Sequence, residues 1–296
     1  MTIEALKAQI HSVRDLQSVV KTMKALAAVS IRQYERAVES LADYNQTVET
    51  GFQILLKYRD EIDDWGIAFS TRPDEPKLGA IVFGSDQGLC GQFNEQIATH
   101  ALQFLENCGV PQNRQKLAAV GARVVPSFEV HRRTFSEQFS VPSSVLAITE
   151  RVQGLLVEIE RWQAEEQVDR VFLFYNRSKS GSRYKPYTQQ LFPLDTQWLQ
   201  RLEKQPWNGR TLPMFSMDAP QLFSALIRQY LFVSLYRAFA ESLASENASR
   251  LASMQSAEKN IQERLDELNA EYRRQRQSAI TGELLDIVAG FEALRD

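Results

Sequence analysis

The sequence has few of the residues from which metal and nucleophilic sites are built. Its 296 residues include two cysteines and three histidines, and no two of these lie next to each other. Cys90 and Cys108 form no CxxC pair, which excludes the usual zinc and dithiol motifs. We therefore predict no metal site, no disulfide scaffold and a reducing compartment.

Long apolar runs are also absent. The N-terminal segment MTIEALKAQIHSVRDL is charged from residue 4, so it has no apolar core of a secretory signal. The longest candidate for a membrane span, residues 226–239, is interrupted by Arg228, Gln229 and Arg237. A membrane helix needs roughly 18 consecutive apolar residues. We expect the chain to reach a membrane only through partners.

A surplus of positive charge is missing as well. The formal net charge is −3 and the sequence pI is about 5.8. A protein that binds nucleic acid by its phosphates needs an excess of Lys and Arg, so we predict no nucleic-acid partner. With 44% hydrophobic residues the chain has enough apolar material for one large core or two smaller ones.

Proline is missing from both ends of the chain, before Pro73 and after Pro220. In the first segment, steps of three and four residues fall mostly on apolar side chains. A repeat held over many heptads keeps one stripe facing a partner helix, and residues 3–57 would form a helix about 80 Å long. The positions are Ile3, Leu6, Ile10, Val13, Gln17, Val20, Lys24, Ala27, Ile31, Tyr34, Val38, Leu41, Asn45, Val48, Phe52 and Leu55.

The last third of the chain has the same periodicity. Asp218 is a plausible N-cap, with Pro220 in the first helical turn. The apolar pattern runs from Leu222 to Tyr272 and then resumes in a shifted register. We predict that helices 1–60 and 218–296 pair as an antiparallel coiled coil; the alternative is a compact helix bundle. The positions after the shift are Ile280, Leu284, Ile287, Phe291 and Leu294.

The segment 77–200 has the sequence pattern of an α/β domain. Apolar runs that end at turn residues alternate with helical periodicity, which favours a mostly parallel, Rossmann-like sheet. Glycine and proline between residues 176 and 220 indicate loops, apart from one edge strand. The predicted strands are 78–83, 116–120, 171–175 and 187–192, and the predicted helices are 94–107 and 145–166.

One glycine turn, GSDQGLCGQFN at residues 84–94, lies where α/β proteins often hold phosphate. Its spacing is neither GxGxxG nor GK[ST], and no lysine lies between Lys77 and Lys116. We interpret it as a strand-to-helix connection with no cofactor, and Cys90 as a small buried residue. The sequence offers no catalytic acid–base pair or triad, so we predict that the chain is not itself an enzyme.

The same turn resembles the S-D-R-G-L-C-G-x-F-N segment of the gamma subunit of F-type ATP synthases. Further matches follow in order along the whole chain: I-x-S-V at residues 10–13, K-A-M-x-x-V-A-A at 21–28 and Y-N at 175–176. They continue with Q-L-L-P-L at 190–194, L-A-S-E-x-A-A-R at 243–250 and R-Q-x-x-I-T-x-E at 276–283.

The chain also departs from the family pattern. Gln87 replaces the usual arginine of the glycine turn, and residues 29–31 read V-S-I where the family has A-S-K. Ile261 and Gln262 stand where many members have small residues, and the chloroplast-type insertion with its cysteine pair is absent. These departures suggest the divergent, sodium-pumping N-type branch.

The resemblance implies a central rotor shaft that couples ion flow through a membrane c-ring to ATP synthesis or hydrolysis on an alpha/beta hexamer. It implies a peripheral position on the cytoplasmic face of the cell membrane or on the thylakoid membrane, with the epsilon subunit as a further partner. It places contacts with beta subunits at Met23, Lys24, Arg276, Gln277, Thr281 and Glu283. It places the side facing the c-ring and epsilon at Ser85, Asp86, Gln87, Gly88 and Leu89.

Charge on the first helix suits this interpretation, since residues 7–36 carry six basic and two acidic side chains, a balance of +4. Such a run can also be a merely solvated helix face. Two other classes stay open on the residues alone. One is a coiled-coil adaptor with a non-catalytic α/β module, and the other is a nucleotide-binding α/β enzyme.

Overall fold

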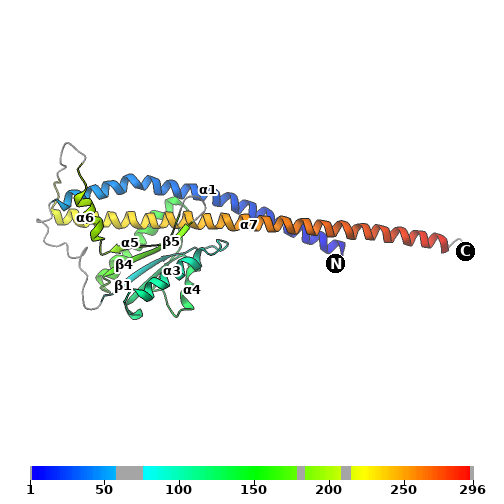
Figure 1. The fold of residues 1–296 in the computed structure, drawn as a ribbon, viewed down its shortest axis with the longest axis horizontal. Coiled ribbons are helices and arrows are strands. Elements are labelled where there is room, and N and C mark those ends of the chain that lie inside the picture. The colour runs from blue at the N-terminus through cyan, green and yellow to red at the C-terminus, as the bar shows by residue number, and fades with distance from the viewer. Residues whose placement is uncertain (1, 58–75, 179–183, 208–214, 294–296) are drawn as a thin grey trace. The chain divides into compact units, whose positions relative to one another are not determined.

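The computed structural model describes residues 2–57, 76–178, 184–207 and 215–293 (Figure 1). Its contacts divide the chain into two compact units, Met1–Ala27 with Arg250–Asp296, and Ala28–Ser249. Two helices, α1 (Ile3–Leu56) and α7 (Ala219–Ala293), contribute to both units.

Both long helices follow from the proline pattern. Helix α7 begins directly after Asp218, whose carbonyl accepts a hydrogen bond from the Leu222 amide at 3.0 Å. Pro220 lies in the first turn, where its missing N–H costs nothing. Gly282, a weak helix former in the interior of the segment, does not interrupt the helix.

In the first unit, α1 and α7 run antiparallel. Lys7 Nζ lies 5.9 Å from the centre of the Tyr272 ring, and Gln17 donates a hydrogen bond to Gln262 at 3.0 Å. Increasing numbers on α1 thus pair with decreasing numbers on α7, and the predicted coiled coil is confirmed. The seam is an apolar cluster of Leu6, Ile10, Val20, Met254, Ile261, Leu265 and Leu268.

The apolar stripe that resumes at Ile280 does not join this seam. Ile280, Leu284 and Ile287 are 48%, 58% and 65% exposed. With Lys7 beside Tyr272, α1 has only about one further turn before it ends, so it cannot cover them. This stripe is therefore left exposed within the first unit, and the side chains of Phe291 and Leu294 lie outside the described residues.

The second unit is built on a five-stranded sheet in the order β3-β2-β1-β4-β5. The first four strands are parallel, and β5 joins as an antiparallel edge strand. This order agrees with the predicted Rossmann-like α/β fold. The strands are β1 (Leu78–Phe83), β2 (Gln115–Val120), β3 (Glu137–Phe139), β4 (Arg170–Ser178) and β5 (Tyr184–Phe192).

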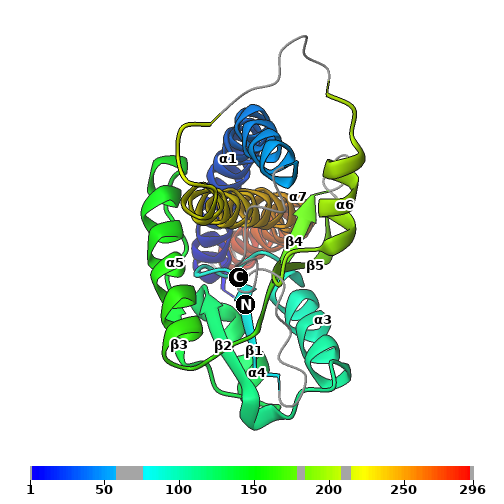
Figure 2. The same ribbon diagram turned by 90° about the vertical axis from the view of Figure 1, so that its left-hand side faces the viewer.

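Helices cover both faces of this sheet, which explains why β1 and most of β4 are continuous apolar runs. Helices α3 (Phe93–Asn107) and α4 (Val125–Glu129) cover one face, with Ala80 and Val82 of β1 in that core. Helix α5 (Ile148–Ala164) and α7 cover the other face, with Ile81 and Phe83. Within this unit α1 lies on the outer side of α7, so α7 is enclosed between α1 and the sheet (Figure 2).

Because α7 is enclosed between α1 and the sheet, polar residues of α7 are buried along with apolar ones. Residues 238–249 are buried without interruption, and buried polar groups need hydrogen-bond partners. Ser245 Oγ donates to the Asn176 carbonyl at 2.9 Å, and Ser249 Oγ donates to the Cys90 carbonyl at 2.5 Å. These bonds attach α7 to β4 and to the glycine turn.

Three α-helices and strands were not predicted. Helix α6 (Thr196–Lys204) lies where we expected only loops, and the predicted elements also lack the short helix α4 and the three-residue strand β3. The Asp195 side chain caps α6 by accepting a bond from the Gln197 amide at 2.9 Å. Its buried Leu199 and Leu202 share a core with Phe52 of α1, so distant residues stabilise this short helix.

Candidate functional site

The glycine turn joins β1 to α3 and is bonded to the protein itself. The Ser85 amide donates to Asn94 Oδ1 at 2.9 Å, and Asn94 Nδ2 donates to Ser85 Oγ at 2.9 Å. The Asp86 carboxylate accepts hydrogen bonds from the amides of Ala122 and Val141 at 2.9 and 2.8 Å. The polar groups of the turn therefore fix its own loop and the neighbouring strand ends.

Close backbone packing supports the same interpretation. Gly121 has φ +93, and a Cβ atom there would lie 2.7 Å from the Ser85 amide nitrogen. A Cβ atom at Gly84 would lie 2.7 Å from Cβ of Val124. The turn is thus packed against the β2–α4 connection, as a tight structural connection requires.

Cys90, at the end of the turn, is 2% exposed, so the prediction of a small buried residue is confirmed. Its sulfur lies 3.5 Å from Ser85 Oγ and 3.5 Å from Asn94 Nδ2. The imidazole of His100 instead contacts Thr188 Oγ1 at 2.8 Å, and partial burial lowers the pKa of His100. Cys90 and His100 therefore bond to different groups and form no nucleophile–base pair.

The five turn residues named for the c-ring and epsilon side differ in accessibility. Ser85 is fully buried and Asp86 is half-buried, whereas Gln87 is exposed and Leu89 is 61% exposed. Leu89 has φ 63, which turns its side chain outward at a backbone angle that few residues adopt. Gln87, Gly88 and Leu89 therefore form the outer surface of the turn.

The residues named for beta-subunit contact form two groups in the first unit. Lys24 makes an ion pair with Glu258 at 2.5 Å, and Met23 packs against the apolar seam. Arg276 lies about 27 Å further along α7 than Glu258, at the helical rise of 1.5 Å per residue. The sequence therefore named two separate surfaces rather than one.

The second group is solvent-exposed. Arg276, Gln277, Thr281 and Glu283 all have exposed side chains, and Thr281 Oγ1 donates to the Gln277 carbonyl at 2.9 Å. Gln277 and Thr281 also contribute to a shallow surface hollow. The hollow is lined by Arg274, Gln277, Ser278, Thr281, Gly282 and Leu285.

Two features bear on cofactors and membranes. Across 2–57, 76–178, 184–207 and 215–293, the His, Cys, Asp and Glu side chains form no cluster of three or more that could hold a metal ion. None of the helices in the described part of the chain combines the length and apolar character that a bilayer span requires.

Comparison with known proteins decides the family. The family model described as ATP synthase matches residues 2–294. A gamma chain of ATP synthase from Pelagibacter ubique is 30% identical over 300 residues, with 99% of each chain covered. The chain belongs to the ATP synthase gamma chain family.

Other gamma chains and solved structures agree. The gamma chain of an Anaeromyxobacter species is 29% identical, again over 99% of each chain. A chain of the Euglena gracilis mitochondrial ATP synthase, from a structure of its OSCP, F1 and c-ring, matches with a TM-score of 0.61 at 18% identity. That match covers 99% of this chain and 94% of the other. The Euglena rotor structure matches with a TM-score of 0.58 at 16% identity, covering 94% and 99%.

Family membership confirms the resemblance to gamma chains and the prediction of a non-catalytic subunit, and it disfavours an unrelated coiled-coil adaptor. Sequence reasoning missed one further feature, a polar cavity bordered by Arg177 of β4 and Arg237 of α7. The available signal was Arg237, a charged residue within an apolar helical run.

Proposed function

We propose that this gamma chain is the central rotor shaft of an F-type ATP synthase or ATPase. It couples ion flow through a membrane c-ring to ATP synthesis or hydrolysis on an alpha/beta hexamer. The observation that carries the proposal is the antiparallel pairing of α1 and α7, in a chain that matches the family from residue 2 to residue 294.

The helices have the properties that torque transmission requires. Each is free of proline beyond its first turn, and side chains interlocked along a coiled-coil seam resist unwinding. In the second unit α7 is held by buried hydrogen bonds to β4 and to the glycine turn. A twist applied to the sheet is therefore passed to α7 through rigid, fully buried contacts.

We assign the partners by segment, keeping the division into residues 1–60, 77–200 and 218–296. The paired helices enter the alpha/beta hexamer, and the α/β domain faces the epsilon subunit and the c-ring. The similar solved chains come from structures named for a rotor, for OSCP, F1 and c-ring, and for a central stalk with c-ring. The chain is then a peripheral subunit on the cytoplasmic face of the membrane that holds the c-ring.

The contact residues are part of the proposal. Arg276, Gln277, Thr281 and Glu283 have the exposure that contact with beta subunits needs. Lys24 already forms an ion pair with Glu258, so a carboxylate of a beta subunit that contacts Lys24 would add to that pair. On the base, Gln87 and Leu89 meet epsilon or the c-ring, while buried Ser85 and Asp86 hold the turn in place.

Reconstitution tests the assignment. The chain is mixed with alpha and beta subunits of its own complex, and ATPase activity is measured. Arg276→Ala is compared with Arg264→Ala, which removes a cation of the same helix that pairs with Glu267 at 2.8 Å. We expect both variants to assemble with alpha and beta. Arg276→Ala should lower the ATPase activity several-fold, and Arg264→Ala should leave it unchanged. Failure of the wild-type chain to join alpha and beta would refute the shaft assignment.

Membership of the sodium-pumping branch rests on the departures at Gln87, at residues 29–31 and at Ile261 and Gln262. We propose it on those residues alone. ATP hydrolysis by the complete membrane-bound complex should then rise with added Na⁺ at constant ionic strength. A rate that responds to pH but not to Na⁺ would assign the complex to proton coupling and leave the shaft assignment intact.

A further inference from the structure

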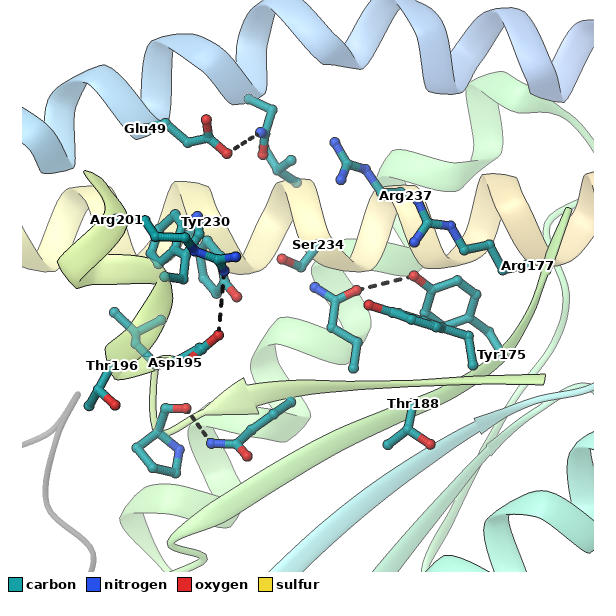
Figure 3. A pocket seen from close by; sticks show the side chains of 18 residues that line it. Glu49, Tyr175, Arg177, Thr188, Asp195, Thr196, Arg201, Tyr230, Ser234 and Arg237 are labelled. Atoms are coloured by element: carbon teal, nitrogen blue, oxygen red, sulfur yellow. Dashed lines mark hydrogen bonds and ion pairs between the residues drawn. The ribbon is translucent and has the colours of Figure 1, made fainter. Parts of the chain in front are cut away.

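The 28–249 unit contains a polar cavity of about 730 Å³ that the shaft function does not use. It lies between α1 and α7 on one side and β4, β5 and the start of α6 on the other (Figure 3). Its size is that of ordinary small-molecule sites. The lining includes three arginines and three tyrosines: Tyr175, Arg177, Tyr187, Arg201, Tyr230 and Arg237.

The three arginines of the cavity face two carboxylates of the lining, those of Glu49 and Asp195, and a third carboxylate, that of Glu241, lies beside Arg177. Arg201 pairs with Asp195 at 3.8 Å, at one end of the lining. Arg177 and Arg237 both lie near one carboxylate, that of Glu241, which is 8% exposed. Arg177 Nε lies 3.3 Å from Glu241 Oε2. Two guanidinium groups therefore share a single carboxylate.

Arg237 is the less satisfied of the two. Its Nε is buried and has no hydrogen-bond partner among the described residues, and the same holds for Glu241 Oε2. Figure 3 shows the Arg237 side chain reaching from α7 toward α1, and the Arg177 side chain reaching from β4 toward α7. A buried donor without an acceptor is costly, so an incoming acceptor at this place would be stabilised.

We propose that this cavity binds a small multivalent oxyanion of the phosphate class between Arg177 and Arg237. A guanidinium group presents a planar fork of donors that matches two oxygens of such an anion. Two forks from different elements, β4 and α7, hold a tetrahedral anion from two sides.

The remaining lining is compatible with a bound anion. Burial raises the pKa of Tyr175 and of Tyr230, so both phenols are neutral at physiological pH and add no negative charge. The Tyr175 hydroxyl donates to Gln189 Oε1 at 3.2 Å. Glu49 belongs to α1, on the opposite wall, where it accepts a bond from Asn45 at 2.8 Å. The inference depends on this cavity alone and not on the proposed shaft.

Calorimetric titration of the full chain with inorganic phosphate tests the proposal, at low and constant ionic strength. Arg237→Gln removes one fork, and Arg228→Gln is the matched control on the same helix. Arg228 lies outside the cavity and pairs with Glu160 at 2.7 Å. We expect saturable binding of one phosphate, weakened about tenfold or more by Arg237→Gln and unchanged by Arg228→Gln, since a charged hydrogen bond is at stake.

Two further measurements make each outcome decisive. Thermal unfolding of the wild-type chain should shift upward with phosphate but not with sodium chloride of equal ionic strength, which needs no variant. Titration with ADP distinguishes a phosphate carried by a nucleotide from the free ion. Absence of phosphate binding, equal loss in the two variants, or binding of ADP without binding of phosphate would overturn the proposal.

Discussion

Replacing Leu268 with alanine probes the seam between α1 and α7 most sharply. Leu268 is 1% exposed and lies in the apolar cluster that contains Leu6 and Ile10 of α1. Truncating a buried leucine removes its transfer free energy and leaves a cavity, at a cost of about 2–5 kcal/mol. The near-complete burial of Leu268 places the expected loss within that range.

The matched control is Leu285→Ala on the same helix. Leu285 is 64% exposed, and a surface truncation of this kind changes stability by about 0.5 kcal/mol or less. The two variants remove the same atoms from the same helix. A difference in stability between them therefore measures packing at the seam and not a change in helix propensity.

Amide hydrogen exchange across residues 254–272 of the isolated chain measures the effect locally. A loss of about 2–5 kcal/mol speeds exchange through local opening by roughly 30-fold to several thousand-fold, at tenfold per 1.4 kcal/mol. Leu285→Ala should leave these amides within a few-fold of the wild type. Equal acceleration by both variants would show that α1 does not cover this part of α7.

Three further variants test contacts in both units. Gly121→Ala should destabilise the 28–249 unit by about 2 kcal/mol or more in urea unfolding, because φ of Gly121 is +93 and the new Cβ atom would meet the Ser85 amide. The control is Gly88→Ala, which should be near neutral because no atom lies within 4 Å of a Cβ atom there. Ala27→Pro, at a buried position of α1, removes a helical hydrogen bond and costs ~3 kcal/mol or more, so a variant complex that still makes ATP at the normal rate would contradict the stiff-shaft argument. The hydrogen bond from Lys24 lowers the pKa of Glu258, so the stabilisation it gives is present above the ordinary carboxyl pKa and is lost as pH falls through the lowered value. Glu258→Gln should remove this part of the acid sensitivity, as measured by thermal unfolding over a series of pH values. An unchanged pH profile would count against the ion pair.

Much of the fold could be predicted because its strongest signals are local. Strand 78–83 was predicted with the bounds observed for β1, and α3 begins one residue before the predicted helix 94–107. Each is an apolar pattern that ends at a glycine or a turn. The heptad stripe of the first helix likewise coincides with buried positions, among them Leu6, Val20 and Phe52.

What could not be predicted depends on distant residues. Helix α6 is stabilised by a core shared with α1, which no window of its own sequence contains. The stripe at Ile280 has a seam-like period, but the register of the pair decides that α1 ends before reaching it. The site residues were named from resemblance, and periodicity alone could not distinguish exposed Arg276 from Lys24, which is paired with Glu258.

The central claim is that this chain turns as a shaft. The most direct measurement fixes the alpha/beta hexamer to a surface and attaches a bead to the chain through Val130→Cys, an 80% exposed position of the 28–249 unit. With ATP supplied, the account predicts that the bead rotates continuously in one direction and stops when ATP is removed. Steady ATP hydrolysis by complexes whose attached beads do not turn would contradict it.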